Sequence, residues 1–193
     1  MANKAPTWLE RTILFGRNFF KHPRMLGSLI PSSRFLVSRL LRCVDWNRAQ
    51  VIVEYGPGVG VFTSEILRRM PSDATLVVFE TNENFVEYVR RALPDRRLHV
   101  IHGSAAEIGT VLAQLGFTHA DYIVSGIPYS TMPAAIRDAI LNESRAALGA
   151  QGHFLVYQFS RAALPHLRRV FSKVELDFEP LNIPPASLFL CQP

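Results

Sequence analysis

The segment Val51-Ile-Val-Glu54-Tyr55-Gly56-Pro57-Gly58-Val59-Gly60 decides the fold, because an apolar run enters a glycine-rich turn and a helical pattern follows it. Such an order predicts a buried β-strand, a turn and then a helix. Glycine permits positive φ angles and lets the backbone pass close to a ligand, while the start of the next helix offers unpaired N–H groups. The segment therefore predicts a ligand-binding turn at the end of a strand.

The residues after this turn alternate between short β-branched runs and helical stretches, which is typical of a parallel α/β sheet. The expected strands cover residues 51–55, 75–80, 98–102, 121–125 and 153–159. The expected helices lie near residues 63–70, 84–93, 105–115 and 134–147. Two more strands, at 174–178 and 187–191, are joined by a proline-containing link that is too short for a crossover helix. We therefore expect an antiparallel hairpin at the end of the sheet.

The composition limits the class of protein. The 193 residues, 48% of them apolar and 19% charged, can form one full globular core. Cys43 and Cys191 form no CxxC pair, which excludes a zinc ribbon and a disulfide-rich secreted fold. No apolar run reaches the roughly 18–20 residues that span a bilayer, and Glu10, Arg11 and Arg17 interrupt any secretory signal. We expect a cytoplasmic protein, and we assign no metal site because the six histidines lack ligand spacing.

The first part of the chain, residues 1–47, is predicted to be a helical arm that precedes the domain formed by residues 48–193. Residues 1–50 carry nine basic and two acidic side chains, a net charge of +7, which favours an anionic partner. Residues 8–21 form an amphipathic helical pattern with aromatic side chains opposite basic ones, as in helices that lie in an anionic membrane interface. The candidate membrane-binding residues are Trp8, Arg11, Phe15, Arg17, Phe19 and Lys21. The alternatives are a lid packed on the domain and a solvated basic face.

A second helix is expected within the arm, after residues 8–21. Pro31-Ser32-Ser33 offers its N-terminal cap, and the apolar pattern continues to about residue 44.

The GxGxG pattern, with Glu54 two residues before the first glycine, resembles motif I of class I S-adenosylmethionine-dependent methyltransferases. The resemblance implies a Rossmann-like, seven-stranded, mostly parallel sheet with an antiparallel last strand, and S-adenosyl-L-methionine as the cofactor. Glu80 ends the second strand, where a carboxylate accepts hydrogen bonds from both ribose hydroxyls. Ser104 stands where the family often has an acidic residue near the adenine. The candidate cofactor-binding residues are Glu54, Gly56, Gly58, Gly60, Glu80, Thr81, Ser104, Ala105 and Ser125.

The segment Ser125-Gly126-Ile127-Pro128-Tyr129 resembles motif IV, which faces the methyl acceptor. In ribosomal RNA adenine dimethylases this loop is Asn/Asp-x-Pro-Tyr/Phe, and its amide or carboxylate accepts a hydrogen bond from the base amine. Gly126 stands at that position and has no side chain to do so. The sequence also has no counterpart of the helical RNA-binding domain of those enzymes. We therefore expect a substrate other than nucleic acid and keep the nucleic-acid enzyme as an alternative.

Three motifs together resemble small bacterial phospholipid N-methyltransferases: Pro31-Ser-Ser, Ser125-Gly-Ile-Pro and Asn182-Ile-Pro-Pro-Ala. The resemblance implies methylation of the amine headgroup of a membrane lipid, phosphatidylethanolamine or a similar one, by a cytoplasmic enzyme that associates reversibly with the membrane. A cofactor-binding protein without catalysis is a further alternative, and the sequence makes no prediction of the oligomeric state.

The residues that would meet this lipid follow from the same reasoning. Tyr129 is the first candidate catalytic residue at the acceptor site and Tyr157 the second aromatic there, although either can also be an ordinary buried aromatic. An aromatic face attracts the methylated ammonium product. Arg24, Arg34 and Arg161 are candidates to hold the lipid phosphate, with a plain surface role as the alternative.

Overall fold

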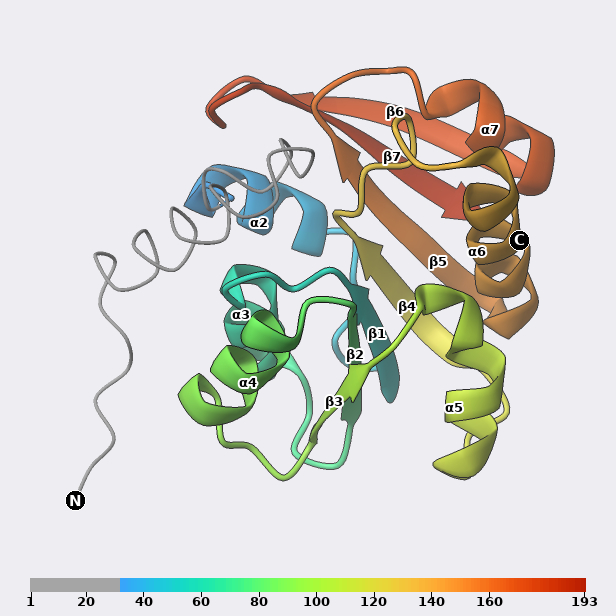
Figure 1. The fold of residues 1–193 in the computed structure, drawn as a ribbon. Helices are drawn as coiled ribbons and strands as arrows, with labels where there is room; N and C mark the ends of the chain where they lie inside the picture. The colour runs from blue at the N-terminus through green and yellow to red at the C-terminus, as the bar shows by residue number, and fades with distance from the viewer. Residues whose placement is uncertain (1–31) are drawn as a thin grey trace.

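The computed structural model describes residues 32–193, which form a seven-stranded sheet in the order β3-β2-β1-β4-β5-β7-β6 (Figure 1). The strands are β1 (Val51–Tyr55), β2 (Thr75–Glu80), β3 (Leu98–His102), β4 (Ala120–Ser125), β5 (Leu148–Gln158), β6 (Lys173–Glu179) and β7 (Ala186–Gln192). β1 to β5 pair in parallel, and β7 runs antiparallel to both of its neighbours, β5 and β6. The predicted Rossmann-like fold with an antiparallel last strand is confirmed.

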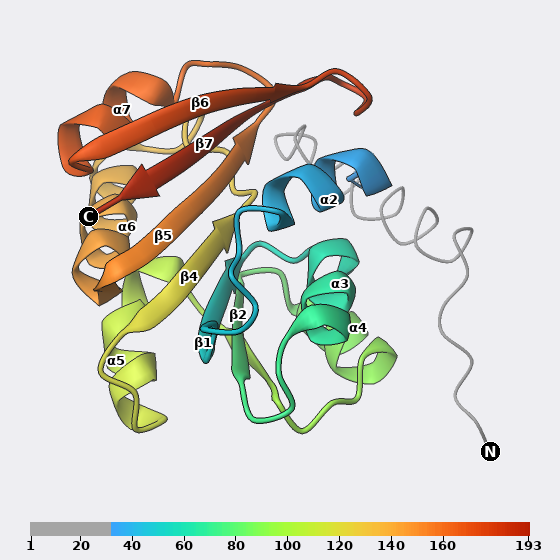
Figure 2. The ribbon, with the colours of Figure 1, turned by 180° about the vertical axis from the view of Figure 1, so that it is seen from behind.

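Helices cover both faces of this sheet (Figures 1 and 2). They are α2 (Arg34–Leu41), α3 (Val61–Arg69), α4 (Glu83–Ala92), the 3-10 helix η2 (Ala105–Glu107), α5 (Ile108–Gln114), α6 (Ala134–Ala147) and α7 (Leu164–Val170). α2 and α3 share one apolar core with alternate residues of the central strands, and α5, α6 and α7 share another. The central strands are thus buried on both faces, as expected for a parallel sheet.

Besides shifts of one or two residues at element ends, three elements and one additional helix differ from the sequence-based predictions. The helix expected at 105–115 begins as η2, because the Ser104 side chain caps that turn by accepting a hydrogen bond from the Ala106 N–H at 3.2 Å. β5 starts at Leu148 rather than 153, because Gly149 and the exposed residues at 150–151 give its first part no strand-like apolar pattern. The helix after Ser33 ends at Leu41 rather than near 44. α7 was not predicted, and its seven residues include a proline at the N-terminal end.

The carboxyl ends of the parallel strands meet along one edge of the sheet, hereafter the carboxyl edge. Gln158, at the end of β5, pairs with Ser187 near the start of β7, and Ser187 pairs with Phe178 near the end of β6. The turn between β6 and β7, residues 180–185, therefore also lies at the carboxyl edge. Ligands of open α/β sheets bind outside this edge.

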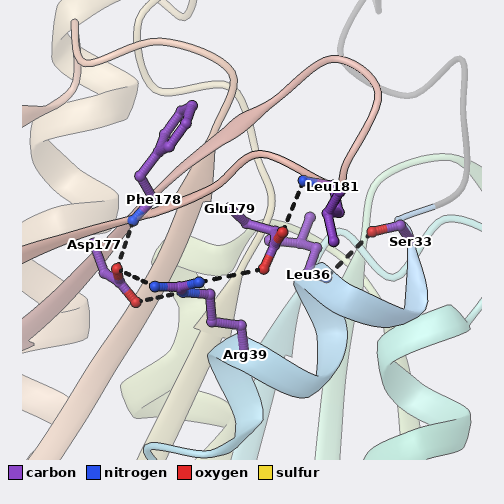
Figure 3. Close-up of polar contacts among 7 residues, drawn as sticks. All are labelled: Ser33, Leu36, Arg39, Asp177, Phe178, Glu179 and Leu181. Carbon is purple, nitrogen blue, oxygen red and sulfur yellow. Dashed lines mark hydrogen bonds and ion pairs between the residues drawn. The ribbon is translucent and has the colours of Figure 1, made fainter.

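Helix α2 is fastened to the C-terminal hairpin at the same edge (Figure 3). The Arg39 guanidinium donates to Asp177 at 2.7 Å and lies 3.7 Å from the Glu179 carboxylate. The Ser33 N–H donates to Asn182 Oδ1 at 2.8 Å. Residues from opposite ends of the chain thus lie side by side next to the glycine-rich turn.

The predicted membrane-binding residues within 8–21, and Arg24, lie outside the described residues. No helix within residues 32–193 is both long and apolar enough to cross a membrane. The second helix of the predicted arm, α2, is described, and its buried residues Leu36 and Leu40 pack in one core with Phe62 and Ile66 of α3.

Candidate active site

The glycine-rich turn has a backbone that requires glycine. Gly56, Gly58 and Gly60 have φ angles of 69°, 53° and 72°, a region that side chains rarely adopt. A Cβ at Gly56 would lie 2.8 Å from Ile127 Cγ2, so space is lacking as well. The turn leads into the N-terminus of α3, whose first N–H groups face outward from the helix. This cradle is open to a ligand group that approaches the backbone.

Glu80 stands beside this cradle, at the end of β2. Its side chain is buried, its Oε1 accepts a hydrogen bond from the Asn82 N–H at 2.9 Å, and its Oε2 lies 3.4 Å from the Gly58 nitrogen. Burial raises the pKa of Glu80, and the neighbouring backbone N–H groups oppose that shift. The carboxylate is thus fixed next to the glycine turn, where the sequence predicts contact with the ribose.

Glu54 is the second buried carboxyl group of the site. Its Oε2 accepts a hydrogen bond from the Thr63 hydroxyl at 2.7 Å. Burial raises the pKa of Glu54 to about 8, the Thr63 hydrogen bond opposes the shift, and the charge of Glu80 adds to it. A carboxyl group with such a pKa takes up or releases a proton near neutral pH, and it favours a nearby cation when ionised.

The remaining predicted cofactor residues follow β2 and β3. The Ser104 hydroxyl caps η2, and Ala105 is buried in the core. Thr81 is exposed, and its carbonyl oxygen lies 3.2 Å from His102 Nε2. These residues all stand at the carboxyl edge, and their contacts with a cofactor stay predictions.

Ser125 and Tyr129 lie inside the core. Both side chains are fully buried, and their hydroxyls form a hydrogen bond of 2.8 Å. The Tyr129 ring packs edge-on against Phe154 at a centroid distance of 6.2 Å. This placement favours the alternative of a packing aromatic for Tyr129 over direct contact with a methyl acceptor.

Tyr157 occupies the position next to motif IV. A Cβ placed on Gly126 would overlap the Tyr157 hydroxyl, so a side chain at 126 and this ring exclude each other. The ring stacks on Phe62 at a centroid distance of 5.0 Å and meets Phe159 edge-on. Burial raises the pKa of the Tyr157 hydroxyl to about 12, and a hydrogen bond with the Ser32 side chain opposes the shift. The hydroxyl thus fills the space that an Asn or Asp side chain at 126 would take.

Two residues that hold the acceptor side together were not predicted. Gln158 Nε2 donates to the Ile127 carbonyl at 2.8 Å and ties the motif IV loop to the end of β5. Asn182 is buried, accepts from Ser33 and donates from Nδ2 to the Pro184 carbonyl at 2.7 Å. Asn182 could have been predicted from the Asn-Ile-Pro-Pro-Ala motif, whereas Gln158 belongs to no motif in the sequence.

The candidate phosphate-binding arginines of the described residues are on the surface. Arg34 opens α2, and its guanidinium lies 4.8 Å from the centroid of the Phe35 ring. Arg161 is exposed and follows the end of β5 by three residues. Both therefore stand at or near the carboxyl edge, but no contact links them to each other.

The fold and this glycine turn define a class I S-adenosylmethionine-dependent methyltransferase. The solved structure named "PigF with SAH" superposes with a TM-score of 0.65 at 15% identity, covering 97% of this chain and 62% of that one. Precorrin-6y C5,15-methyltransferase from Geobacter metallireducens superposes with a TM-score of 0.61 at 13% identity, covering 100% and 93%. Both share the fold, and S-adenosyl-L-methionine is the cofactor of this chain.

The family described as Ribosomal RNA adenine dimethylase matches residues 15–162, and the chain belongs to this family. Two relatives align with this chain over very different shares of their length. An "Ornithine lipid N-methyltransferase" of Singulisphaera acidiphila is 32% identical over 181 residues, 93% of this chain and 94% of that protein. A "Ribosomal RNA small subunit methyltransferase A" of Mycoplasma mycoides is 31% identical over 113 residues, 56% of this chain and 40% of that protein.

Proposed function

We propose that this enzyme methylates the amine headgroup of a membrane lipid. The observation that carries the proposal is the alignment with the ornithine lipid N-methyltransferase, which extends over 94% of that relative. The alignment with the ribosomal RNA methyltransferase stops at 40% of its length. Ornithine lipid and phosphatidylethanolamine both carry a primary amine, so either is a candidate acceptor.

The acceptor side of the site supports a lipid amine over a base amine. An exocyclic base amine needs an acceptor at position 126, and the Tyr157 hydroxyl leaves no room for one. An alkyl amine is mostly protonated at neutral pH, as lysine is, so its recognition requires different groups. The Tyr157 ring, one face of which stacks on Phe62, is an aromatic group that attracts an ammonium, and its hydroxyl oxygen accepts a hydrogen bond from it.

The chemistry requires that the amine nitrogen become neutral and point at the methyl group. S-adenosylmethionine supplies that methyl group on a sulfonium. The chain positions the amine and provides a path for its proton. Glu54, whose charge acts on Tyr157 and whose pKa is about 8, is the buried group on this path. Arg24, Arg34 and Arg161 hold the anionic part of the headgroup.

Residues 8–21 are proposed to bind the anionic membrane surface reversibly, which would place a cytoplasmic enzyme at its substrate. Each basic residue near an anionic surface contributes about 1 kcal/mol. Arg11→Glu with Arg17→Glu should therefore weaken vesicle binding and leave cofactor affinity unchanged, measured by sedimentation with vesicles and by calorimetry.

The test of the function uses S-adenosylmethionine labelled in its methyl group. The protein is incubated with a bacterial lipid extract and, separately, with ribosomal RNA, and the lipids are then extracted and separated. Label in an amine lipid, absent with the Gly58→Val variant, is the expected result. Label in RNA alone would overturn the proposal in favour of a nucleic-acid enzyme. Cofactor binding without label in either would indicate a non-catalytic protein.

A further inference from the structure

The large apolar side chains that residues 32–193 expose gather at one edge of the molecule. Leu181 and Ile183, in the turn between β6 and β7, are 59% and 72% exposed. The remaining four of the six are Phe35, Ile136, Leu176 and Phe178. Isolated exposed apolar residues are common on protein surfaces, but a group of them on one side marks an interaction site.

The strand pairing places five of these six side chains at the carboxyl edge. Phe178 pairs with Ser187 at the level where β5 ends, and Leu181 and Ile183 project beyond it in the turn. Phe35 is in the first turn of α2, next to Ser33, which is bonded to Asn182 of the same turn. Ile136 is in the first turn of α6, which returns from the carboxyl end of β4.

Among the polar groups of the hairpin and of α2, Arg39 is neutralised by acidic partners, whereas Arg34 keeps its positive charge at this edge. The acidic residues nearest to Leu181, Asp177 and Glu179, both pair with Arg39 (Figure 3). Glu179 also accepts from the Leu181 N–H at 2.8 Å and is buried. Among the described residues no acidic side chain pairs with Arg34, whose guanidinium lies over Phe35.

We propose that the carboxyl edge, with Leu181 and Ile183 at its tip, inserts into the interface of an anionic bilayer. Aliphatic and aromatic side chains next to unpaired arginines are the combination that binds such an interface. The glycine turn and Tyr157 lie at the carboxyl ends of β1 and β5, along the same edge, so an inserted edge brings them to the level of the headgroups. The choice of a bilayer as partner rests on the proposed lipid substrate, and the residues that form this surface are other than residues 8–21.

The first test measures co-sedimentation of the full chain with vesicles of equal parts phosphatidylglycerol and phosphatidylcholine. Leu181→Asp with Ile183→Asp should lower the partition coefficient about tenfold or more, because charged groups replace the inserted side chains. The matched comparison is between the single variants Ile183→Asp and Leu176→Asp, which introduce the same charge on the same hairpin, at the edge and away from it. Equal losses in both single variants, or none in the double variant, would overturn the proposal.

The second test examines position 183 directly, because residues 8–21 are proposed to bind the same vesicles. Cys43 is exposed and Cys191 buried, so Cys43→Ser with Ile183→Cys leaves one accessible thiol for a polarity-sensitive fluorophore. Its emission should shift to the blue on adding vesicles, and the same label in Cys43→Ser with Leu176→Cys should shift much less. An unshifted label at 183, or a blue shift that accompanies dimerisation without vesicles, would overturn the proposal.

The outcomes separate this inference from the proposed function. Methyl transfer is assayed on amine lipid dispersed in detergent micelles, where no bilayer is needed. If micellar lipid is methylated but position 183 does not insert, only the inserted edge is wrong. If position 183 inserts but lipid is never methylated, the insertion of the carboxyl edge is confirmed and the proposed acceptor is wrong.

Discussion

The two halves of the sheet are built by different kinds of contact. In the cofactor half, β3-β2-β1 with α3, the defining contact joins the Gly58 nitrogen to Glu80, 22 residues apart. In the acceptor half, β4-β5-β7-β6, Gln158 binds Ile127 across 31 residues, and Ser33 binds Asn182 across 149. The first half depends on one strand–turn–helix unit and its neighbour, whereas the second is assembled from distant parts of the chain.

The largest expected effect is on the cofactor half. Gly58→Val forces a side chain into a φ of 53°, and Glu80→Ala removes the carboxylate beside the turn. Hydrogen bonds to a charged group contribute about 1.5–3 kcal/mol each, so either change should weaken S-adenosylmethionine binding about 100-fold in calorimetric titration. Glu83→Ala, an exposed glutamate of the next helix, is the control and should bind normally. Normal binding by both site variants would remove the cofactor assignment.

The residues predicted from the sequence divide between the same two halves of the sheet. Glu80 and the glycines at 56, 58 and 60 were predicted to lie together and do so, because their spacing and backbone needs are local. Tyr129 was ranked above Tyr157, yet the structure buries Tyr129 against Phe154 and sets Tyr157 beside Gly126. A sequence pattern gives the spacing along one loop, but it does not give the side chain that another strand brings to it.

The next largest effect is expected in the acceptor half alone. Gly126→Ala puts a Cβ where the Tyr157 hydroxyl lies, so the ring must move. Methyl transfer should fall about 30-fold, roughly 2 kcal/mol, while cofactor affinity in calorimetry changes little. Gly109→Ala is the matched control, because its Cβ would meet Glu143 at an ordinary 3.7 Å.

A double variant tests whether the overlap is the cause. Gly126→Ala with Tyr157→Ala removes the clash, so the melting temperature of this double variant should equal that of Tyr157→Ala alone, and methyl transfer should not be restored. If Gly126→Ala alone keeps full activity, the Tyr157 ring is not a positioning group for the acceptor.

The smallest effect concerns Glu54, the last residue but one of β1, where the two halves of the sheet meet. Its ordinary pKa of 4.5 is raised to about 8 in the folded chain by burial. Between these values the folded state holds a proton that the unfolded state has lost, so this group's stabilising contribution is present below pH 4.5 and is lost as the pH rises to about 8. One pH unit within that window corresponds to about 1.4 kcal/mol.

Glu54→Gln keeps the shape of the side chain but cannot titrate. Between about pH 6 and pH 7, the free energy of unfolding of the cofactor-free wild type should fall by about 1 kcal/mol more than that of the variant, measured by urea denaturation. Thr63→Val removes the hydrogen bond that lowers the pKa of Glu54. In this variant the free energy of unfolding should therefore continue to fall with pH, relative to Glu54→Gln, up to a higher pH than in the wild type. Identical slopes in the wild type and Glu54→Gln would mean that Glu54 is ionised throughout this range. Its carboxylate would then be too weak a base to hold a proton taken from an amine bound beside Tyr157, and the proton path would have to run through other groups.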